Sequence, residues 1–260
     1  MELANSTTTL VASHAQSGEL LVMGDVPLDT LRELSDHGLL RCPHCGGLLR
    51  LKAGTIRLPH FAHVALAECH ARDSEPESEA HRAGKLALYQ HFRQGASHAA
   101  LEYPVRPTNQ RADVFIAPKY VLEFQQANNT FDQWCERHRL YASQGLLDVW
   151  FLGQIRYTEA QRERLRPISP YDPRRMPRDT YEASAGAFRV RELERAILET
   201  FGVLYYLNPE DDRVTCLLPR ELNANTLRAY RYIFPLNQCH LNDAGLWTPI
   251  TPFVRPARGQ

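Results

Sequence analysis

The sequence has no excess of charge of either sign and no long hydrophobic run. Its 30 basic and 30 acidic residues cancel, and the sequence pI is about 7.2. The charge balance therefore predicts no global attraction to DNA or to a membrane surface, so any contact with nucleic acid must come from a local patch. Because no stretch of about 18 apolar residues exists, we expect no membrane span.

Cysteine is also sparse, with 6 cysteines in 260 residues, which is too few for a disulfide framework. Residues 1–20 show no basic segment followed by an apolar one, so no signal peptide is evident. We therefore expect a cytoplasmic protein with one or two domains. The sequence contains no P-loop, no dinucleotide-binding glycine motif and no internal repeat.

Lysine is the scarcest charged residue. Of the 30 basic residues, only Lys52, Lys85 and Lys119 are lysines. Where arginine is the usual choice, a retained lysine indicates that a compact ammonium group is wanted.

Residues 111–125, RADVFIAPKYVLEFQ, predict a β-hairpin with a carboxylate near each outer end. If the loop is 117–119, Asp113 lies opposite Glu123, and opposed side chains share a face roughly 5 Å apart. Two carboxylates at this distance repel each other unless a divalent cation, Mg²⁺ or Mn²⁺, lies between them. Gln125 shares the face of Glu123 and adds a polar group. The alternative is that these acids are polar positions on a half-exposed hairpin.

A pattern of metal ligands precedes this hairpin, in RCPHCGGLLRLKAGTIRLPHFAH. We expect Cys42, Cys45, His60 and His63 to hold one structural Zn²⁺, with four ligands that leave no position open for catalysis. The H-x-x-H spacing is shorter than usual, and Cys69 and His70 are further possible ligands. The alternative is a surface C-x-x-C with unrelated histidines.

The sequence S-x-x-E at 74–77 predicts the start of a helix that ends near Phe92. Glu77, His81 and Lys85 are four residues apart and form one stripe, which continues into apolar residues. The stripe therefore reaches the rim of the core, where we expect an active site. The alternatives are that Glu77 only caps the helix and that the other two lie on a solvated face.

The strand and helix patterns that follow complete the order helix, three strands, helix, strand over 74–152. A second capping box, at 130–133, predicts the second helix, and Gly145 ends it. Residues 154–180 read as a mildly basic connector, and a helix and a hairpin follow at 189–218. We expect Arg174 and Arg175 of the connector to contact DNA phosphates; the alternative is that they pair with nearby acids in solvent.

Several motifs taken in order resemble the competence protein CoiA family over about residues 5–153. They are CPHC, PHFAH, ESEAH-x-x-x-K, RADV, EFQ, ER-x-x-x-Y and VWFL. The resemblance implies an α/β (α+β) fold with a PD-(D/E)XK nuclease-like core of order α-β-β-β-α-β, preceded by a small zinc-binding β-rich region. It also implies a role in handling incoming DNA during natural transformation.

The resemblance assigns roles to individual residues. It implies that Asp113 and Glu123 bind the metal, that Gln125 stands where the superfamily usually has lysine, and that the helix motif contributes to catalysis. We expect Lys85 to supply the charge that Gln125 lacks. The expected catalytic residues are Glu77, His81, Lys85, Asp113, Glu123 and Gln125. The expected DNA-binding residues are Arg111, Arg137, Tyr141, Arg174 and Arg175.

Three regions are expected: a zinc-binding region at 1–73, the nuclease-like core at 74–153, and an α/β region of unknown role at 154–260. Two functions stay open. One is a Mg²⁺-dependent nuclease that acts on DNA, single-stranded or in recombination intermediates, together with recombination proteins. The other is a DNA-binding factor on a nuclease fold that does not cut.

Overall fold

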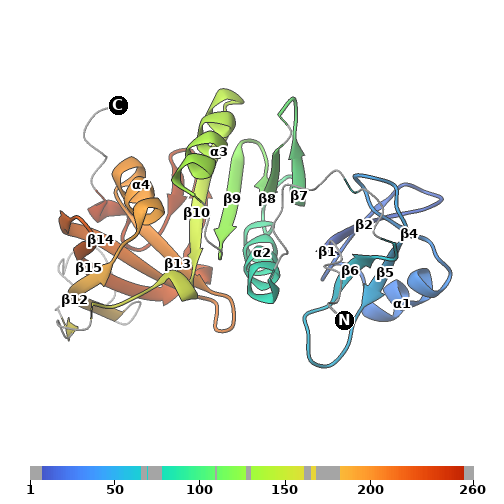
Figure 1. Ribbon diagram of the computed structural model, residues 1–260, viewed down its shortest axis with the longest axis horizontal. Coiled ribbons are helices and arrows are strands. Elements are labelled where there is room, and N and C mark those ends of the chain that lie inside the picture. The colour runs from blue at the N-terminus through green and yellow to red at the C-terminus, as the bar shows by residue number, and fades with distance from the viewer. Residues whose placement is uncertain are drawn as a thin grey trace.

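A nine-stranded mixed sheet forms the centre of the molecule, and a small β-rich region lies beside its β7 edge (Figure 1). The computed structural model describes residues 8–65, 69, 78–108, 110–126, 130–160, 165–167 and 182–254. The strand order in the sheet is β11-β12-β15-β14-β13-β10-β9-β8-β7. Within the described residues, no helix is long and apolar enough to cross a membrane.

The predicted order of helix, three strands, helix and strand is confirmed. The hairpin pairs Ile116 with Tyr120, which leaves the predicted loop 117–119, and β9 and β10 pair in parallel. The elements are α2 (Glu79–Phe92), β7 (Ala99–Val105), β8 (Gln110–Ile116), β9 (Tyr120–Gln125), α3 (Phe131–Ser143) and β10 (Leu147–Gly153).

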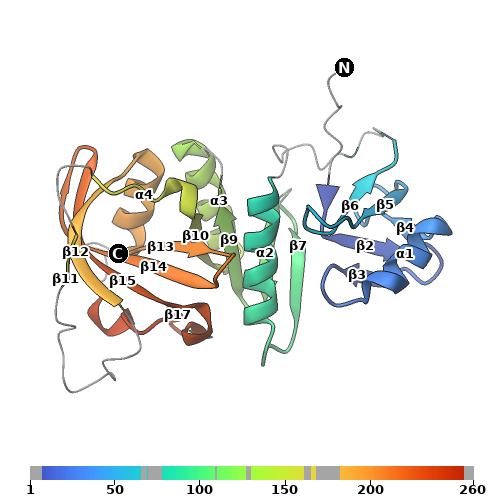
Figure 2. The same cartoon turned by 90° about the horizontal axis from the view of Figure 1, so that it is seen from below.

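Helices cover both faces of this sheet. Helix α2 buries Leu88 and Phe92 against one face, whereas α3 buries Trp134 and Tyr141 against the other. Helix α4 (Glu192–Phe201) packs beside α3, and Figure 2 shows α2 apart from these two helices. The strands between the helices are therefore buried on both faces, which explains their continuous apolar runs.

The first helix of the core begins later than the sequence indicated. Ser78 has an extended backbone, and its hydroxyl accepts the His81 N–H, so Ser78 is the N-cap and the helix starts at Glu79. The predicted S-x-x-E box at 74–77 lies outside the described residues. The capping box of Thr130 and Gln133 on α3 is confirmed.

The N-terminal region consists of two small sheets and one helix. The sheets have the orders β1-β6-β5 and β3-β2-β4. Strands β2 and β3 pair antiparallel, and helix α1 follows them. The elements are β1 (Thr8–Thr9), β2 (Val11–His14), β3 (Leu20–Val22), α1 (Leu28–Asp36), β4 (Leu40–Arg41), β5 (Leu49–Lys52) and β6 (His60–His63).

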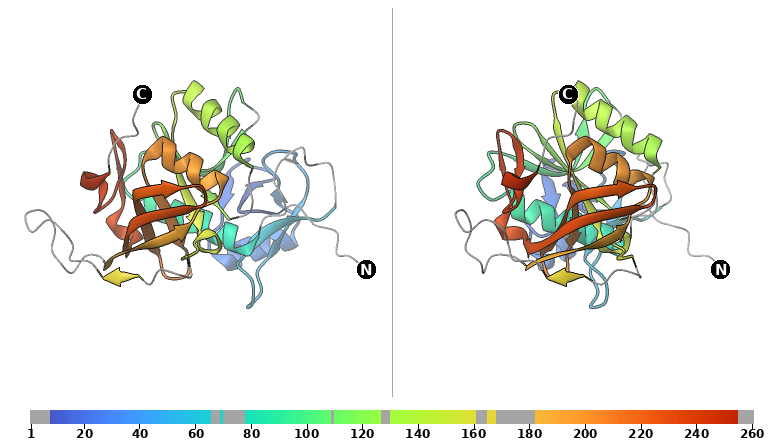
Figure 3. Two further views of the ribbon diagram at one scale, coloured as in Figure 1. Left: turned by 60° about the vertical axis from the view of Figure 1, so that its left-hand side comes forward. Right: turned by 90° about the vertical axis from the view of Figure 1, so that its left-hand side faces the viewer.

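The C-terminal region extends the central sheet. Strand β13 pairs in parallel with β10, so one sheet crosses from the core into this region. The predicted hairpin is present as β13 and β14, whereas the long strands β12 and β15 were not predicted. In Figure 3 these orange and red strands form the end of the sheet far from the N-terminal region. The elements are β11 (Arg166–Pro167), β12 (Glu182–Arg189), β13 (Leu204–Asn208), β14 (Arg213–Asn223), β15 (Thr226–Pro235), β16 (His240–Asn242) and β17 (Gly245–Trp247).

Gly84 lets α2 lie close to the sheet, and this yields a stability prediction. A Cβ atom at Gly84 would lie 2.3 Å from the Phe124 ring, whereas a Cβ at Gly54 would meet nothing within 4 Å. Gly84→Ala should therefore destabilise the protein by about 1–3 kcal/mol through overpacking, despite alanine's better helix propensity. Urea denaturation measures the effect, with Gly54→Ala as the matched control. Equal midpoints for the two variants would contradict this packing.

Candidate functional site

Strands β7 and β8 both lose their regular alternation at the same level. Leu101 pairs with Val114 and Tyr103 with Ala112. Regular alternation would place Leu101 and Tyr103 on one face, but Leu101 packs toward α2 and Tyr103 toward α3. Ala112 and Val114 are divided in the same way. Glu102, between Leu101 and Tyr103, has a φ of 52°, which is in the left-handed region.

Asp113 stands opposite Glu102 and bonds to α2. Its Oδ2 lies 3.2 Å from His81 Nε2 and accepts the Phe124 N–H at 2.9 Å. Burial raises the pKa of the Asp113 carboxyl, but His81 and Lys85 outweigh burial and hold that pKa well below its usual range. Within the described part of the chain, both hydrogen bonds fall on Oδ2, so Oδ1 can still accept a ligand.

Glu123 follows Leu122, the last residue of β9 that pairs with β8, and its side chain bonds to α3. The residue is 2% exposed. Its Oε2 accepts from Arg137 at 2.6 Å, and its Oε1 accepts from the Tyr141 hydroxyl. Burial raises the pKa of Glu123 to about 7, although Arg137 opposes this shift. The register of the hairpin is the predicted one, but its two acids are held by helices on opposite faces of the sheet.

Lys85 is buried rather than on a solvated face. It is 1% exposed and donates to Glu102 Oε1 at 2.8 Å. Burial raises the pKa of Glu102, yet Lys85 and Arg111 lower it to about 2, so the pair is ionised. Glu102 is a member of this site that the sequence reasoning missed, because no pattern distinguishes it from other acids in a strand.

The remaining predicted residues of the core occupy different environments. Gln125 is buried on β9, and Arg111 lies 3.8 Å from Glu102 Oε2. Tyr141 was expected to contact DNA, but it is 0% exposed and donates to Glu123. That expectation is therefore wrong, and Tyr141 positions the carboxylate. The Nε of Arg137 is buried and has no hydrogen-bond partner among the described residues.

Three predicted site residues cannot be placed. Glu77, Arg174 and Arg175 lie outside the described residues. Within the described part of the connector, Arg156 is buried and paired with Glu194 at 2.8 Å, so it does not face DNA.

A cluster of thiols and an imidazole is the second candidate site. Ligand atoms of Cys42, Cys45, His63 and Cys69 all lie within 4.8 Å of one another. Partial burial of Cys45 raises the pKa of its thiol, but the Gly47 N–H and His63 lower it more, to about 7. Such a group is readily converted to the thiolate that binds a metal ion.

His60 does not belong to this cluster, which corrects the predicted ligand set. His60 and His63 are three residues apart on β6, and side chains of a strand alternate, so the two rings point to opposite faces. His60 Nδ1 instead lies 2.8 Å from the Leu58 carbonyl oxygen. Cys69 takes the fourth position.

The geometry of the four ligands suits zinc. Tetrahedral Zn²⁺ with Zn–S bonds of about 2.3 Å places its ligand atoms roughly 3.8 Å apart. The Cys42 and Cys69 sulfurs are 3.9 Å apart, and Cys45 Sγ lies 3.4 Å from His63 Nε2. The cluster could therefore hold a metal ion such as zinc in a closed structural site.

The two candidate sites are neighbours. His44 lies between the two cysteines of the C-x-x-C turn, and charged groups of the core shift its pKa. Burial and Arg111 lower the pKa of His44, whereas Glu102 raises it. The turn that carries the metal ligands thus approaches the Glu102 end of the carboxylate site.

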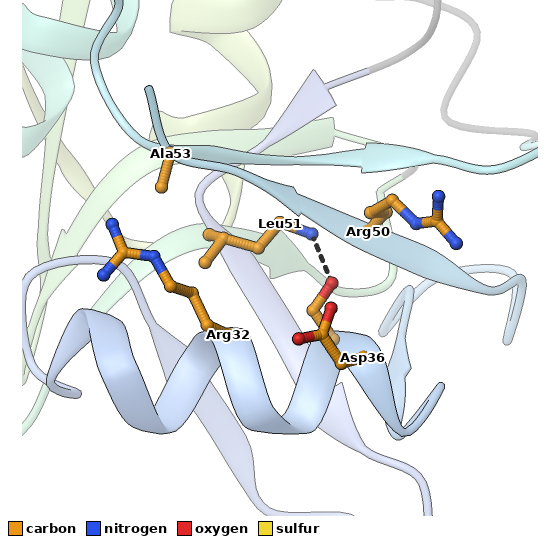
Figure 4. Close-up of a pocket in the computed structure, with 6 residues that line it drawn as sticks. Arg32, Asp36, Arg50, Leu51 and Ala53 are labelled. Atoms are coloured by element: carbon orange, nitrogen blue, oxygen red, sulfur yellow. Dashed lines mark hydrogen bonds between the residues drawn. The ribbon is translucent and has the colours of Figure 1, made fainter. Parts of the chain in front are cut away.

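Two surface hollows lie away from both sites. One, of about 280 Å³, lies between α1 and β5, where the Leu51 N–H donates to Ser35 Oγ at 3.0 Å (Figure 4). The other, of about 630 Å³, is lined by Arg156, Arg189 and Arg191 in the C-terminal region. Neither is lined by the two acids of the hairpin.

Comparisons with known proteins place the chain in context. A family model described as "Competence protein CoiA, N-terminal domain" matches residues 25–72, and one described as "Competence protein CoiA, nuclease-like domain" matches residues 77–172. The competence protein CoiA of Bacillus subtilis (strain 168) is 36% identical over 118 residues, which are 44% of this chain and 31% of that protein. The matched part thus covers less than two thirds of that relative. No solved structure matches the chain.

The metal cluster yields a prediction that separates Cys69 from His60. Protein purified without added metal should contain about one zinc per chain, because such sites bind tightly. Cys69→Ser should lose most of this zinc, since it removes a ligand. His60→Gln should retain it. Elemental analysis of both variants measures the difference, and the opposite result, zinc lost only in His60→Gln, would restore the H-x-x-H ligand set.

Proposed function

Because this chain belongs to the competence protein CoiA family through its N-terminal and nuclease-like domains, we propose that it is a divalent-metal-dependent DNA nuclease. One observation carries the proposal. The Asp113 charge raises the pKa of Glu123, so the two carboxylates lie within electrostatic range of each other where the pairing of β8 and β9 ends. His81 of α2 contacts Asp113 and Arg137 of α3 contacts Glu123, from opposite faces of the sheet. DNA taken up in natural transformation is the substrate that the family name suggests.

Asp113 and Glu123 would hold the metal ion, Mg²⁺ or Mn²⁺. Asp113 is ionised, and the hydrogen bonds it accepts from described residues leave Oδ1 available. Glu123 accepts one bond on each oxygen, and an ionised carboxylate has about four acceptor positions, so a metal can be added. When bound, the ion polarises a phosphoryl oxygen and lowers the pKa of a bound water. The donors are all oxygens, as Mg²⁺ and Mn²⁺ prefer.

The positive charges around the acids suit a phosphodiester. Arg137 reaches from α3 to Glu123, and its side chain is 27% exposed, so its guanidinium can also donate to a phosphate oxygen. Lys85 stands on the α2 side and stabilises negative charge there. Gln125 carries no charge, so it can only orient a water or a phosphate by hydrogen bonds.

A second candidate function is a DNA-binding factor that does not cut. It is favoured by the pairing of Lys85 with Glu102 at 2.8 Å, because the carboxylate neutralises much of the lysine charge. Uncharged Gln125 in the lysine position points the same way. DNA, single-stranded or in recombination intermediates, is the partner under both functions, and recombination proteins are possible further partners.

The first test of this function is cleavage by an Asp113 variant. Asp113→Asn keeps the size of the side chain but removes the charge, so it should reduce cleavage of DNA in Mg²⁺ or Mn²⁺ by at least about a hundredfold. Asp132→Asn, in the exposed first turn of α3, is the matched control and should cut at the parental rate. Labelled single- and double-stranded DNA on a denaturing gel gives the rates.

Each outcome of this test is informative. Cleavage by Asp113→Asn at the parental rate would contradict the site. A parent protein that binds DNA but does not cut it in either metal would select the second function.

The second test concerns Lys85. Lys85→Arg keeps the charge, but a planar guanidinium cannot reproduce a compact ammonium in a fully buried position. We expect cleavage to fall by about tenfold or more with DNA affinity unchanged. Lys52→Arg, on the exposed side of β5, is the control. Circular dichroism checks the fold, and parental cleavage by a folded Lys85→Arg protein would exclude a role for this lysine in catalysis.

A further inference from the structure

Glu102 is held in a conformation that its own residue type disfavours. It lies on β7 with φ 52°, although only glycine adopts the left-handed region without cost. Its side chain is nevertheless buried, at 3% exposure for the residue. A residue in such a conformation persists only where its surroundings determine it, and such residues gather at functional sites.

The donors to Glu102 come from two different regions. From the N-terminal region, the Thr9 hydroxyl and the Leu10 N–H donate to the carboxylate, the latter at 3.2 Å. From the core, Lys85 Nζ donates at 2.8 Å, and Arg111 lies at 3.8 Å. One carboxylate therefore joins β1 of the N-terminal region to α2 and β8 of the core.

The same strand of the N-terminal region leads to the metal cluster. Thr9 on β1 pairs with Phe61 on β6, and β6 ends in the cluster residue His63. A chain of direct contacts thus runs from the cluster through β6 and β1 to Glu102 and Lys85.

Further contacts dock the two regions along α2. Arg82 donates to the Thr8 hydroxyl at 3.2 Å, and Tyr89 donates to Asp25 at 2.7 Å. Leu10 belongs to the same apolar core as Leu88 of α2. The N-terminal region is therefore packed against the core and is not an independent module on a linker.

We propose that Glu102 is a positioning residue through which the metal-binding N-terminal region fixes Lys85 beside Asp113. When the Cys/His cluster holds its metal, β6 and β1 are ordered, and Thr9 and Leu10 keep the Glu102 carboxylate on the α2 face. When the metal is lost, Glu102 loses these donors, its backbone can leave the left-handed region, and Lys85 loses its fixed partner. The zinc state of one region is thereby transmitted to the carboxylate site of the other.

This coupling rests on the proposed function only for the catalytic role of Lys85. The test of the coupling measures no DNA cleavage. A failure of the coupling therefore does not decide the nuclease function, and a failure of the nuclease function does not decide the coupling. Hydrogen exchange measured by mass spectrometry on the full chain, with and without a zinc chelator, reports the order of each segment.

In the parent protein, the chelator should accelerate amide exchange at 79–92 and 99–105 as well as in the N-terminal region. The acceleration should be about ten- to a hundredfold, the factor that corresponds to losing one hydrogen bond to a charged group. Acceleration confined to residues 8–65, with 79–92 and 99–105 unchanged, would overturn the proposal.

Two variants place the coupling at Glu102. Glu102→Gln keeps the shape but removes the charge, so exchange at 99–105 should be fast even with metal, and the chelator should add little. Glu221→Gln, on an exposed ion pair of β14, is the matched control and should respond like the parent. If Glu102→Gln does not fold, Thr9→Val replaces it, because this variant removes one donor to Glu102. With metal bound, Thr9→Val should accelerate amide exchange at 99–105. Exchange there at the parental rate would overturn the proposal.

Discussion

The buried ion pair between Lys85 and Glu102 is the interaction on which the arrangement of the site depends. Charges are buried at a high cost in desolvation, which only close pairing and further hydrogen bonds offset. Glu102 obtains these bonds by leaving regular strand conformation, which turns its carboxylate toward α2. The opposite residue, Asp113, also bonds toward α2 through His81. A local irregularity shared by β7 and β8 thus directs two acids toward the same helix.

The pKa values of the two acids of the hairpin are shifted in opposite directions. Cationic neighbours hold the pKa of Asp113 well below its usual range, whereas burial raises that of Glu123 to about 7. Because the pKa of Asp113 is lower in the folded state than in the unfolded state, this carboxylate stabilises the fold at pH values above the ordinary pKa of aspartate. The contribution is lost as the pH falls toward the folded-state pKa. The raised pKa of Glu123 acts in the other direction: from about 4.5 to 7 the folded state retains a proton that the unfolded state releases, so stability falls as the pH rises. A cation beside Glu123 would favour its ionised form.

Sequence patterns predicted what depends on local spacing. The three-residue loop set the hairpin register of Asp113 and Glu123, and the C-x-x-C turn predicted two ligands of the metal cluster. His60 was assigned wrongly because H-x-x-H places its two rings on opposite faces of a strand. Cys69 belongs to no helix or strand, so no periodicity indicated that it is a ligand. Glu102 could not be found because its partners, Thr9 and Lys85, are distant in sequence and its backbone conformation has no signature in an ordinary strand. The burial of Tyr141 follows from the packing of α3, which periodicity alone does not specify.

The central claim is that Asp113 and Glu123 together form a site for a divalent cation. Crystals soaked in Mn²⁺ would test it directly, because anomalous scattering distinguishes manganese from lighter atoms and from any zinc bound at the Cys/His cluster. We predict a manganese peak in contact with both carboxylates, and no peak there in crystals of Asp113→Asn. Manganese bound elsewhere, with none in contact with either carboxylate, would contradict it.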